Sequence, residues 1–191
     1  MSKQRLEAFS DGVIAIIITV MVLELRPPTA TNLAALRPLA PVFFSYVLSF
    51  VNLGIYWNNH HHLFQAVEHV NGRVLWANLH LLFWLSLLPF ATAWLGASSF
   101  ATWPVALYGI DLLLAAVAYF LLVQALLPLH GSGSTLADAL GSGLKERISL
   151  GLYVLAVALA FFIPPAAFAL YVLVAAMWLV PDPRIERRMS M

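Results

Sequence analysis

The order of polar and apolar residues along the chain predicts a bundle of membrane helices joined by short polar connections. Four apolar stretches are long enough to cross a hydrocarbon core of about 30 Å at about 1.5 Å per helical residue. They comprise residues 6–25, 41–63, 74–97 and 104–127.

A fifth apolar stretch, from 148 to 180, is interrupted by Pro164 and Pro165. Adjacent prolines remove two backbone donors and clash with the preceding helical turn, which disfavours a single helix across them. We therefore expect two short antiparallel helices, 148–163 and 166–180, with a re-entrant hairpin as the alternative. The predicted fold class is an all-α integral membrane protein with six transmembrane helices per subunit.

The first apolar stretch carries polar groups well inside its length. Its nearly unbroken apolar part, residues 12–25, is too short to cross the core alone, so the helix must begin near Leu6. Ser10 and Asp11 then lie more than a turn from its start. Because an ionisable side chain at that depth is costly, Asp11 marks either a polar contact between helices or an ion path.

Helical geometry sends the side chains of this first helix in two directions. At 100° per residue, Ile16, Val20 and Leu23 share one face, and Thr19 lies at the edge of that stripe. Asp11 points roughly 140° away from Ile16, which favours a structural role over ion binding. In most membrane helices such a stripe simply faces lipid or a neighbouring helix.

Composition supports one membrane domain, residues 1–191, without a separate soluble part. The chain is 62% hydrophobic and 10% charged, whereas soluble domains are about 45–50% apolar and about 25% charged. A net charge of +1 suggests no nucleic-acid partner, and the absence of cysteine excludes disulfides and thiolate chemistry. A cleavable signal peptide is disfavoured because Glu7 and Asp11 interrupt the usual pattern.

The distribution of Lys and Arg predicts how the helices are oriented. Six spans place both termini on one side, and eight basic residues lie there against two on the other side, which puts both termini in the cytoplasm. The eight are Lys3, Arg5, Arg73, Lys145, Arg147, Arg184, Arg187 and Arg188, and the two are Arg26 and Arg37.

This orientation brings polar side chains of the first three helices to a similar depth, near the cytoplasmic ends of these helices. The first helix contributes Ser10 and Asp11, the second Trp57 and the run 60–62, and the third Asn78. Because buried polar groups in lipid need partners, we expect a hydrogen-bonded cluster that fixes the first helix to the other two.

Three consecutive histidines, His60 to His62, raise the question of a metal site. Successive helical residues diverge by about 100°, so the three rings cannot converge on one ion unless the helix has ended. We therefore expect no bound metal. Asp111, in the outer part of the fourth span, needs a partner that the sequence does not identify.

Three segments carry a resemblance to a known family. The string R-x-x-x-F-S-D from Arg5 to Asp11, followed at once by G-V-I-A-I-I-I-T, is similar to the signature of the transmembrane protein 175 family of lysosomal/endosomal potassium channels and their prokaryotic homologues. W-x-x-H from Trp57 and N-L-x-x-L-F-x-x-S-L-L-P-F-x-T, residues 78–92, resemble its accompanying motifs. The resemblance covers roughly the first half of the chain and ends at about Thr92.

The resemblance implies a passive, potassium-selective channel in the cell membrane, formed as a homotetramer without a cofactor. Copies of the first helix would surround the pore and narrow it with apolar rings, the narrowest at Ile16. The pore residues implied are Ile16, Thr19, Val20 and Leu23. The residues implied to pack around this helix are Arg5, Phe9, Ser10, Asp11, Trp57, His60 or His61, and Asn78.

Two other functions are compatible with parts of the sequence. A secondary transporter, with Asp11 and the histidines as a proton relay, would normally show broken helices in related halves, and none is visible. A membrane enzyme with a histidine-bound metal would need a paired carboxylate or a nucleophile arrangement, which is absent, so we expect no enzymatic activity. The string T-V-G-Y-G is absent too, which excludes the usual carbonyl-lined potassium filter. Our hypothesis is that an apolar ring favours potassium by requiring partial dehydration.

Overall fold

The computed structural model describes residues 2–130 and 143–179, and these form six α-helices and one short 3₁₀-helix. The predicted all-α architecture of six helices is confirmed. In chain order the elements are α1 (Lys3–Leu23), η1 (Leu33–Leu39), α2 (Ala40–Gln65), α3 (Gly72–Ala97), α4 (Thr102–His130), α6 (Leu144–Ala160) and α7 (Pro164–Leu179).

Four helical segments have the length and hydropathy to cross a membrane, which makes the chain a multi-pass membrane protein. They are α1, the continuous segment Leu33–Gln65, α3 and α4. Helices α6 and α7 have 17 and 16 residues, about 25 Å each at about 1.5 Å per residue, and are shorter than the hydrocarbon core.

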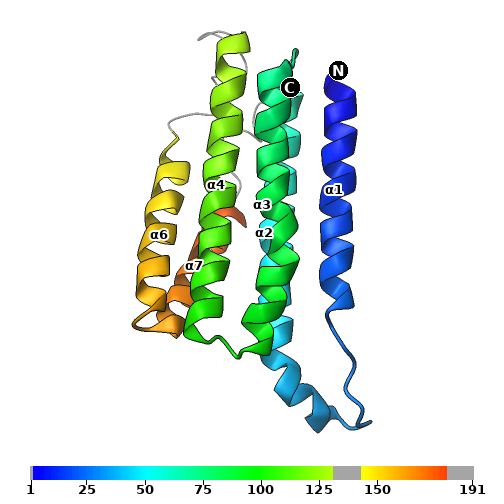
Figure 1. The fold of residues 1–191 in the computed structure, drawn as a ribbon, viewed down its shortest axis with the longest axis vertical. Helices are drawn as coiled ribbons and strands as arrows, with labels where there is room; N and C mark the ends of the chain where they lie inside the picture. The colour runs from blue at the N-terminus through cyan, green and yellow to red at the C-terminus, as the bar shows by residue number, and fades with distance from the viewer. Residues whose placement is uncertain (1, 131–142, 180–191) are drawn as a thin grey trace.

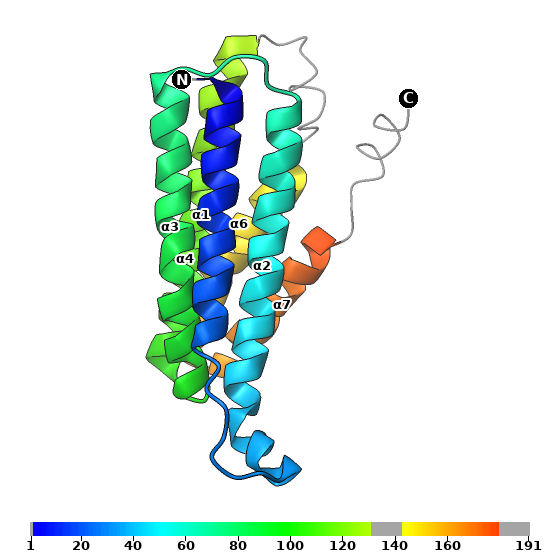
Figure 2. The same cartoon turned by 90° about the vertical axis from the view of Figure 1, so that its right-hand side faces the viewer.

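Helix α1 lies at one edge of the bundle and packs only against α2 and α3 among the principal helix contacts (Figure 1). Helix α4 packs beside α3, while α6 and α7 form the opposite edge. The view turned by 90° shows α1 between α2 and α3 (Figure 2). The start of α1, the end of α2, the start of α3 and the end of α4 lie at one end of the bundle, called here the N-terminal end.

The basic side chains counted in the sequence are divided between the two ends of the bundle. Lys3, Arg5 and Arg73 lie at or beside the starts of α1 and α3, at the N-terminal end, whereas Arg26 and Arg37 lie in the connection and the 3₁₀-helix at the other end. Arg184, Arg187 and Arg188 lie outside the described residues.

The double proline separates α6 from α7, and both prolines belong to α7. The sequence predicts the second helix from residue 166, whereas α7 begins at Pro164. The first residues of a helix need no intrahelical N–H bond, so proline is tolerated there, and its fixed φ suits the first turn. The break itself consists of the three residues 161–163.

A directed chain of buried hydroxyl groups joins α2, α3 and α4. Thr92 donates to the carbonyl oxygen of Leu88 at 2.6 Å, so Ser49 must donate to Thr92 Oγ1, also at 2.6 Å. Tyr108 in turn donates to Ser49 Oγ at 3.0 Å. Each buried hydroxyl therefore has a partner, as a low-dielectric interior requires.

Helices α2 and α3 approach closely at Gly96, and this contact gives a test of the packing. A Cβ atom on Gly96 would lie 2.6 Å from the Cα atom of Val42 and 2.6 Å from Ser45 Oγ. Because the Val42 backbone cannot rotate away, we expect Gly96→Ala to destabilise the protein by about 1–3 kcal/mol.

Thermal unfolding in detergent measures this effect, with Gly54→Ala as the matched control. A Cβ atom on Gly54, inside α2, would have nothing within 4 Å, so alanine there should be neutral or stabilise the helix by up to about 1 kcal/mol. Equal melting temperatures for the two variants would contradict the close packing at Gly96.

Candidate functional site

Helix α1 has two apolar faces, of which only one is packed within the subunit. The packed face comprises Leu6, Ser10, Ile14, Ile17 and Met21, all buried. The other face, called here the open face, comprises Phe9, Ile16, Thr19, Val20 and Leu23, all exposed in the subunit. Ile16 is 63% exposed and Leu23 76% exposed. The four sequence-predicted pore residues therefore share an unpacked surface.

Thr19 donates its hydroxyl proton back into its own helix. The acceptors are the carbonyl oxygens of Ile16 at 2.8 Å and Ala15 at 3.1 Å. Thr19 is also one of the pore residues that the resemblance implies, a role in which its hydroxyl group faces the ion. A hydroxyl whose hydrogen points into the helix still has exposed oxygen lone pairs. The two roles are therefore compatible.

A buried chain of side-chain hydrogen bonds, called here the amide chain, holds α1 against α2 and α3. Asn78 Nδ2 donates to Ser10 Oγ at 2.9 Å, and Ser10 donates to the carbonyl oxygen of Leu6 at 2.9 Å. His60 Nε2 lies 2.8 Å from Asn78 Oδ1. Because a carbonyl oxygen only accepts, His60 carries its proton on Nε2. All three side chains are buried.

A second contact ties α1 to α2 near the surface. Trp57 Nε1 donates to Asp11 Oδ1 at 3.0 Å. The His61 ring stacks on Trp57 with 5.9 Å between ring centroids, and Gln65 donates to His61 Nε2 at 2.9 Å. Asp11 is thus bonded sideways to α2 and is not part of the open face.

The structure resolves which histidine meets the third helix and adds a residue that the sequence did not indicate. His60 contacts Asn78, His61 stacks on Trp57, and His62 lies 3.5 Å from Gln65 Oε1. Gln65 was missed because a glutamine at a helix end carries no motif. Its position one turn after His61 was the only available signal.

Two residues that the resemblance placed around α1 lie outside these hydrogen bonds. Arg5 is exposed at the start of α1, and Phe9 is 50% exposed on the open face. For metal binding, the described residues contain no group of three or more His, Cys, Asp or Glu side chains that could hold an ion.

The geometry defines a multi-pass membrane protein whose first helix is fixed along one face and presents an apolar face outward. A family model described as endosomal/lysosomal potassium channel TMEM175 matches residues 5–89, which comprise α1, α2 and most of α3. The matched segment therefore contains the open face and the amide chain.

Relatives and a solved structure extend this match to the whole chain. A potassium channel of Chryseobacterium sp. (strain P1-3) is 56% identical over 190 residues, which cover 100% of this chain and 99% of that protein. The endosomal/lysosomal proton channel TMEM175 of Danio rerio is 30% identical over 135 residues, 68% of this chain and 25% of that protein.

The crystal structure of a lysosomal potassium-selective channel TMEM175 homolog from Chamaesiphon minutus superposes with a TM-score of 0.82 at 27% identity, covering 93% of this chain and 96% of that chain. The chain belongs to the TMEM175 family. This is a family of ion channels and not of enzymes.

The amide chain makes a testable contribution to stability. Replacing Asn78 by Leu keeps the number and branching of the side-chain heavy atoms but leaves Ser10 Oγ and His60 Nε2 without their partner. We expect a loss of about 1–2 kcal/mol, in the upper range for interhelical hydrogen bonds in membranes. Thermal unfolding in detergent measures it.

Asn58→Leu provides the matched control, because Asn58 is exposed on α2 and should tolerate the change. If the two leucine variants unfolded at the same temperature, the amide chain would contribute nothing to the docking of α1.

Proposed function

We propose that this chain is a passive potassium-selective ion channel that assembles as a homotetramer in the cell membrane. One observation carries the proposal: the open face of α1 is apolar and unpacked along its length, while the opposite face is fixed by buried hydrogen bonds. A single helix cannot enclose a pore, so the open faces of several copies must surround it. The potassium-channel names of the Chryseobacterium relative and of the Chamaesiphon minutus structure support the choice of ion.

Ion passage is limited at the apolar rings that the open face forms around the shared axis. A ring narrower than a hydrated ion either closes by dewetting or requires the ion to lose part of its water shell. Potassium loses water at lower cost than sodium, which gives a preference without a carbonyl filter. Ile16 forms the narrowest ring, and Val20 and Leu23 form further rings towards the other end of α1. The Thr19 oxygen replaces part of the lost hydration next to Ile16.

The remaining polar residues near α1 fix the position of the helix and do not carry the ion. Asp11 accepts from Trp57, and the amide chain ends at a backbone carbonyl of α1 itself. A proton relay would need groups that exchange protons across the membrane, and an amide such as Asn78 does not titrate. These contacts therefore argue against a proton-coupled transporter that uses Asp11 and the histidines.

Both termini lie in the cytoplasm in this proposal. Lys3, Arg5 and Arg73 lie towards the N-terminal end of the bundle, and the excess of basic residues at this end supports an orientation with this end inside the cell. The ion then passes Phe9 first and Leu23 last on its way out of the cell.

Replacing Ile16 by Asn should weaken ion selection. A hydrophilic side chain at the narrowest ring lowers the dehydration cost for sodium as well as for potassium, so we expect sodium flux to rise about tenfold, which corresponds to a barrier lower by about 1.4 kcal/mol. Potassium and sodium fluxes into liposomes with reconstituted protein measure the ratio.

Leu121→Asn is the matched control for Ile16→Asn, because it makes the same kind of change at a similarly exposed site on α4, which α3 separates from α1. Unchanged flux and selectivity in Ile16→Asn, with the tetramer intact, would refute the assignment of the ring.

Cross-linking tests the assembly, because the natural chain has no cysteine. Leu23→Cys places one thiol on the open face, where copies around an axis come close enough for Cβ atoms to reach about 3.5–4.5 Å. We expect a covalent dimer of subunits after mild oxidation, seen on a non-reducing gel. Light scattering of the detergent-solubilised protein should give four subunits.

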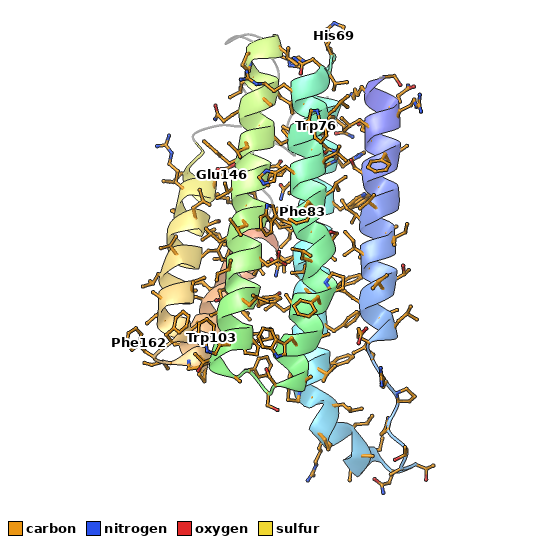
Figure 3. All side chains as sticks on the ribbon, viewed as in Figure 1. His69, Trp76, Phe83, Trp103, Glu146 and Phe162 are labelled. Atoms are coloured by element: carbon orange, nitrogen blue, oxygen red, sulfur yellow. The ribbon has the colours of Figure 1, made fainter. Side chains whose placement is uncertain are left out.

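Trp103→Cys is the control thiol: Trp103 is 67% exposed, lies at the same end of the bundle and is remote from α1 (Figure 3). Equal cross-linking at both positions, or a monomeric mass, would contradict a pore formed by α1.

A further inference from the structure

One buried carboxyl group has no role in the surface described above. Asp111 in α4 is only 6% exposed, and neither of its carboxyl oxygens has a hydrogen-bond partner among the described residues. It lies inside the subunit, about nine residues from the start of α4, which is roughly 13 Å along the helix axis. It is therefore deep in the membrane-spanning bundle and separate from the open face of α1.

An ionised carboxyl group cannot be retained in these surroundings without compensation. Moving an isolated carboxylate out of water costs far more than a folded domain can supply, and such groups are normally neutralised instead. The ionisable groups within electrostatic range are hydroxyl groups: Tyr56 on α2 and Tyr108 on α4. Tyr108 already donates to Ser49.

Among the described residues, no cationic side chain forms a hydrogen bond with Asp111. The basic residues of α6, Lys145 and Arg147, lie at the start of that helix. Helix α3 has no ionisable side chain after His80. At this depth α6 and α7 contribute Tyr153 and Tyr171, and Tyr171 donates its proton to the carbonyl oxygen of Val105 at 3.1 Å. The nearest described acid on α6 is Glu146, which lies near the N-terminal end of that helix (Figure 3).

A cavity with Glu146 in its lining lies beside α4. Its first lining residue on α4 is Ala116, about 7.5 Å along the helix axis from Asp111. The cavity has about 50 Å³ of room between α2, α4 and α6, enough for one or two water molecules at about 30 Å³ each. Its lining includes Asn52, Tyr56, Asn59 and Ala116. Both asparagines donate Nδ2 to their own helix, at 3.0 and 2.9 Å, which leaves their amide oxygens as acceptors. Tyr56 lines the cavity and is also an electrostatic neighbour of Asp111.

We propose that the Asp111 carboxyl group is a proton-binding site inside each subunit and is neutral when it holds the proton. It exchanges this proton with the N-terminal side of the bundle through the cavity that Glu146 lines. A proton is favoured over a metal cation because a dehydrated cation needs several converging oxygen ligands. Among the described residues, no polar group forms a hydrogen bond with either carboxyl oxygen. A proton needs only one of these two oxygens. The site does not depend on the function proposed for α1.

Infrared spectroscopy of the reconstituted full chain tests the protonation state directly. A neutral carboxylic acid has a C=O stretching band that a carboxylate lacks. We expect this band at neutral pH in the natural protein, its loss in Asp111→Asn, and its retention in Glu24→Gln, which removes an exposed acid at the end of α1. The band should disappear reversibly as the pH is raised. A spectrum without the band at neutral pH would overturn the proposal.

Isotope labelling keeps the test valid if Asp111→Asn does not fold. Carboxyl-¹³C aspartate incorporated into the natural protein should shift the band, whereas labelled glutamate should not. A band that moves with glutamate labelling would assign the neutral acid to another residue and overturn the site.

Hydrogen–deuterium exchange tests the route to the site. After transfer to D₂O the band shifts, and Ala116→Leu, which fills the cavity, should slow that shift severalfold. Ala158→Leu makes the same change at an exposed residue of α6 that does not line the cavity, and should leave the rate unchanged. Equal rates in the two variants would refute the cavity as the route. Loss of the band on adding potassium or sodium at constant pH would show a cation site in place of a proton site.

Discussion

The position of α1 depends on the hydrogen bond from the Asn78 amide to the Ser10 hydroxyl. Helix α1 has aliphatic residues on both faces, Ile14 and Ile17 on the packed face and Ile16 and Val20 on the open face. Lipid tails are as apolar as these side chains, so burial from water cannot decide which face turns inward. Polar groups can decide which face turns inward, because a Ser10 side chain facing lipid would lose its hydrogen bond to Asn78. The rotation of α1, and with it the composition of the open face, is therefore specified by the amide chain together with the bond from Trp57 to Asp11.

Both buried polar chains of the described bundle follow the same chemical logic. The amide chain runs from His60 to a backbone carbonyl of α1, and the hydroxyl chain runs from Tyr108 to a backbone carbonyl of α3. Each link pairs one donor with one acceptor. Asp111 is the exception to this rule. This contrast is what makes its carboxyl group stand out from the other buried polar side chains.

The sequence predicted the helices well because their causes are local. Apolar length indicated the long helices, and the double proline indicated the break before α7. The start of α7 differs from the predicted one because Pro164 fits the first turn of a helix. The depth of Ser10 and Asp11 followed from counting residues against membrane thickness.

Partners on other helices were harder to predict, because they depend on how each helix is rotated. His60, His61 and His62 point in directions about 100° apart, and only the packing of α2 on α3 selects His60 for Asn78. For the same reason the sequence could not identify the surroundings of Asp111 or the stacking of His61 on Trp57. Oligomeric assembly and ion passage depend on how neighbouring copies of the chain meet. The sequence of one chain does not specify this, so both stay proposals.

The open face of α1 also determines how the subunits of the proposed assembly associate. In water, exposed residues such as Ile16 and Leu23 would drive immediate association, but in a bilayer the fatty chains solvate them equally well. Association must then arise from the shape fit between helices and from released lipids, which are modest terms. For the proposed assembly, the balance between single subunits and complete assemblies should therefore vary with their two-dimensional dilution in the bilayer.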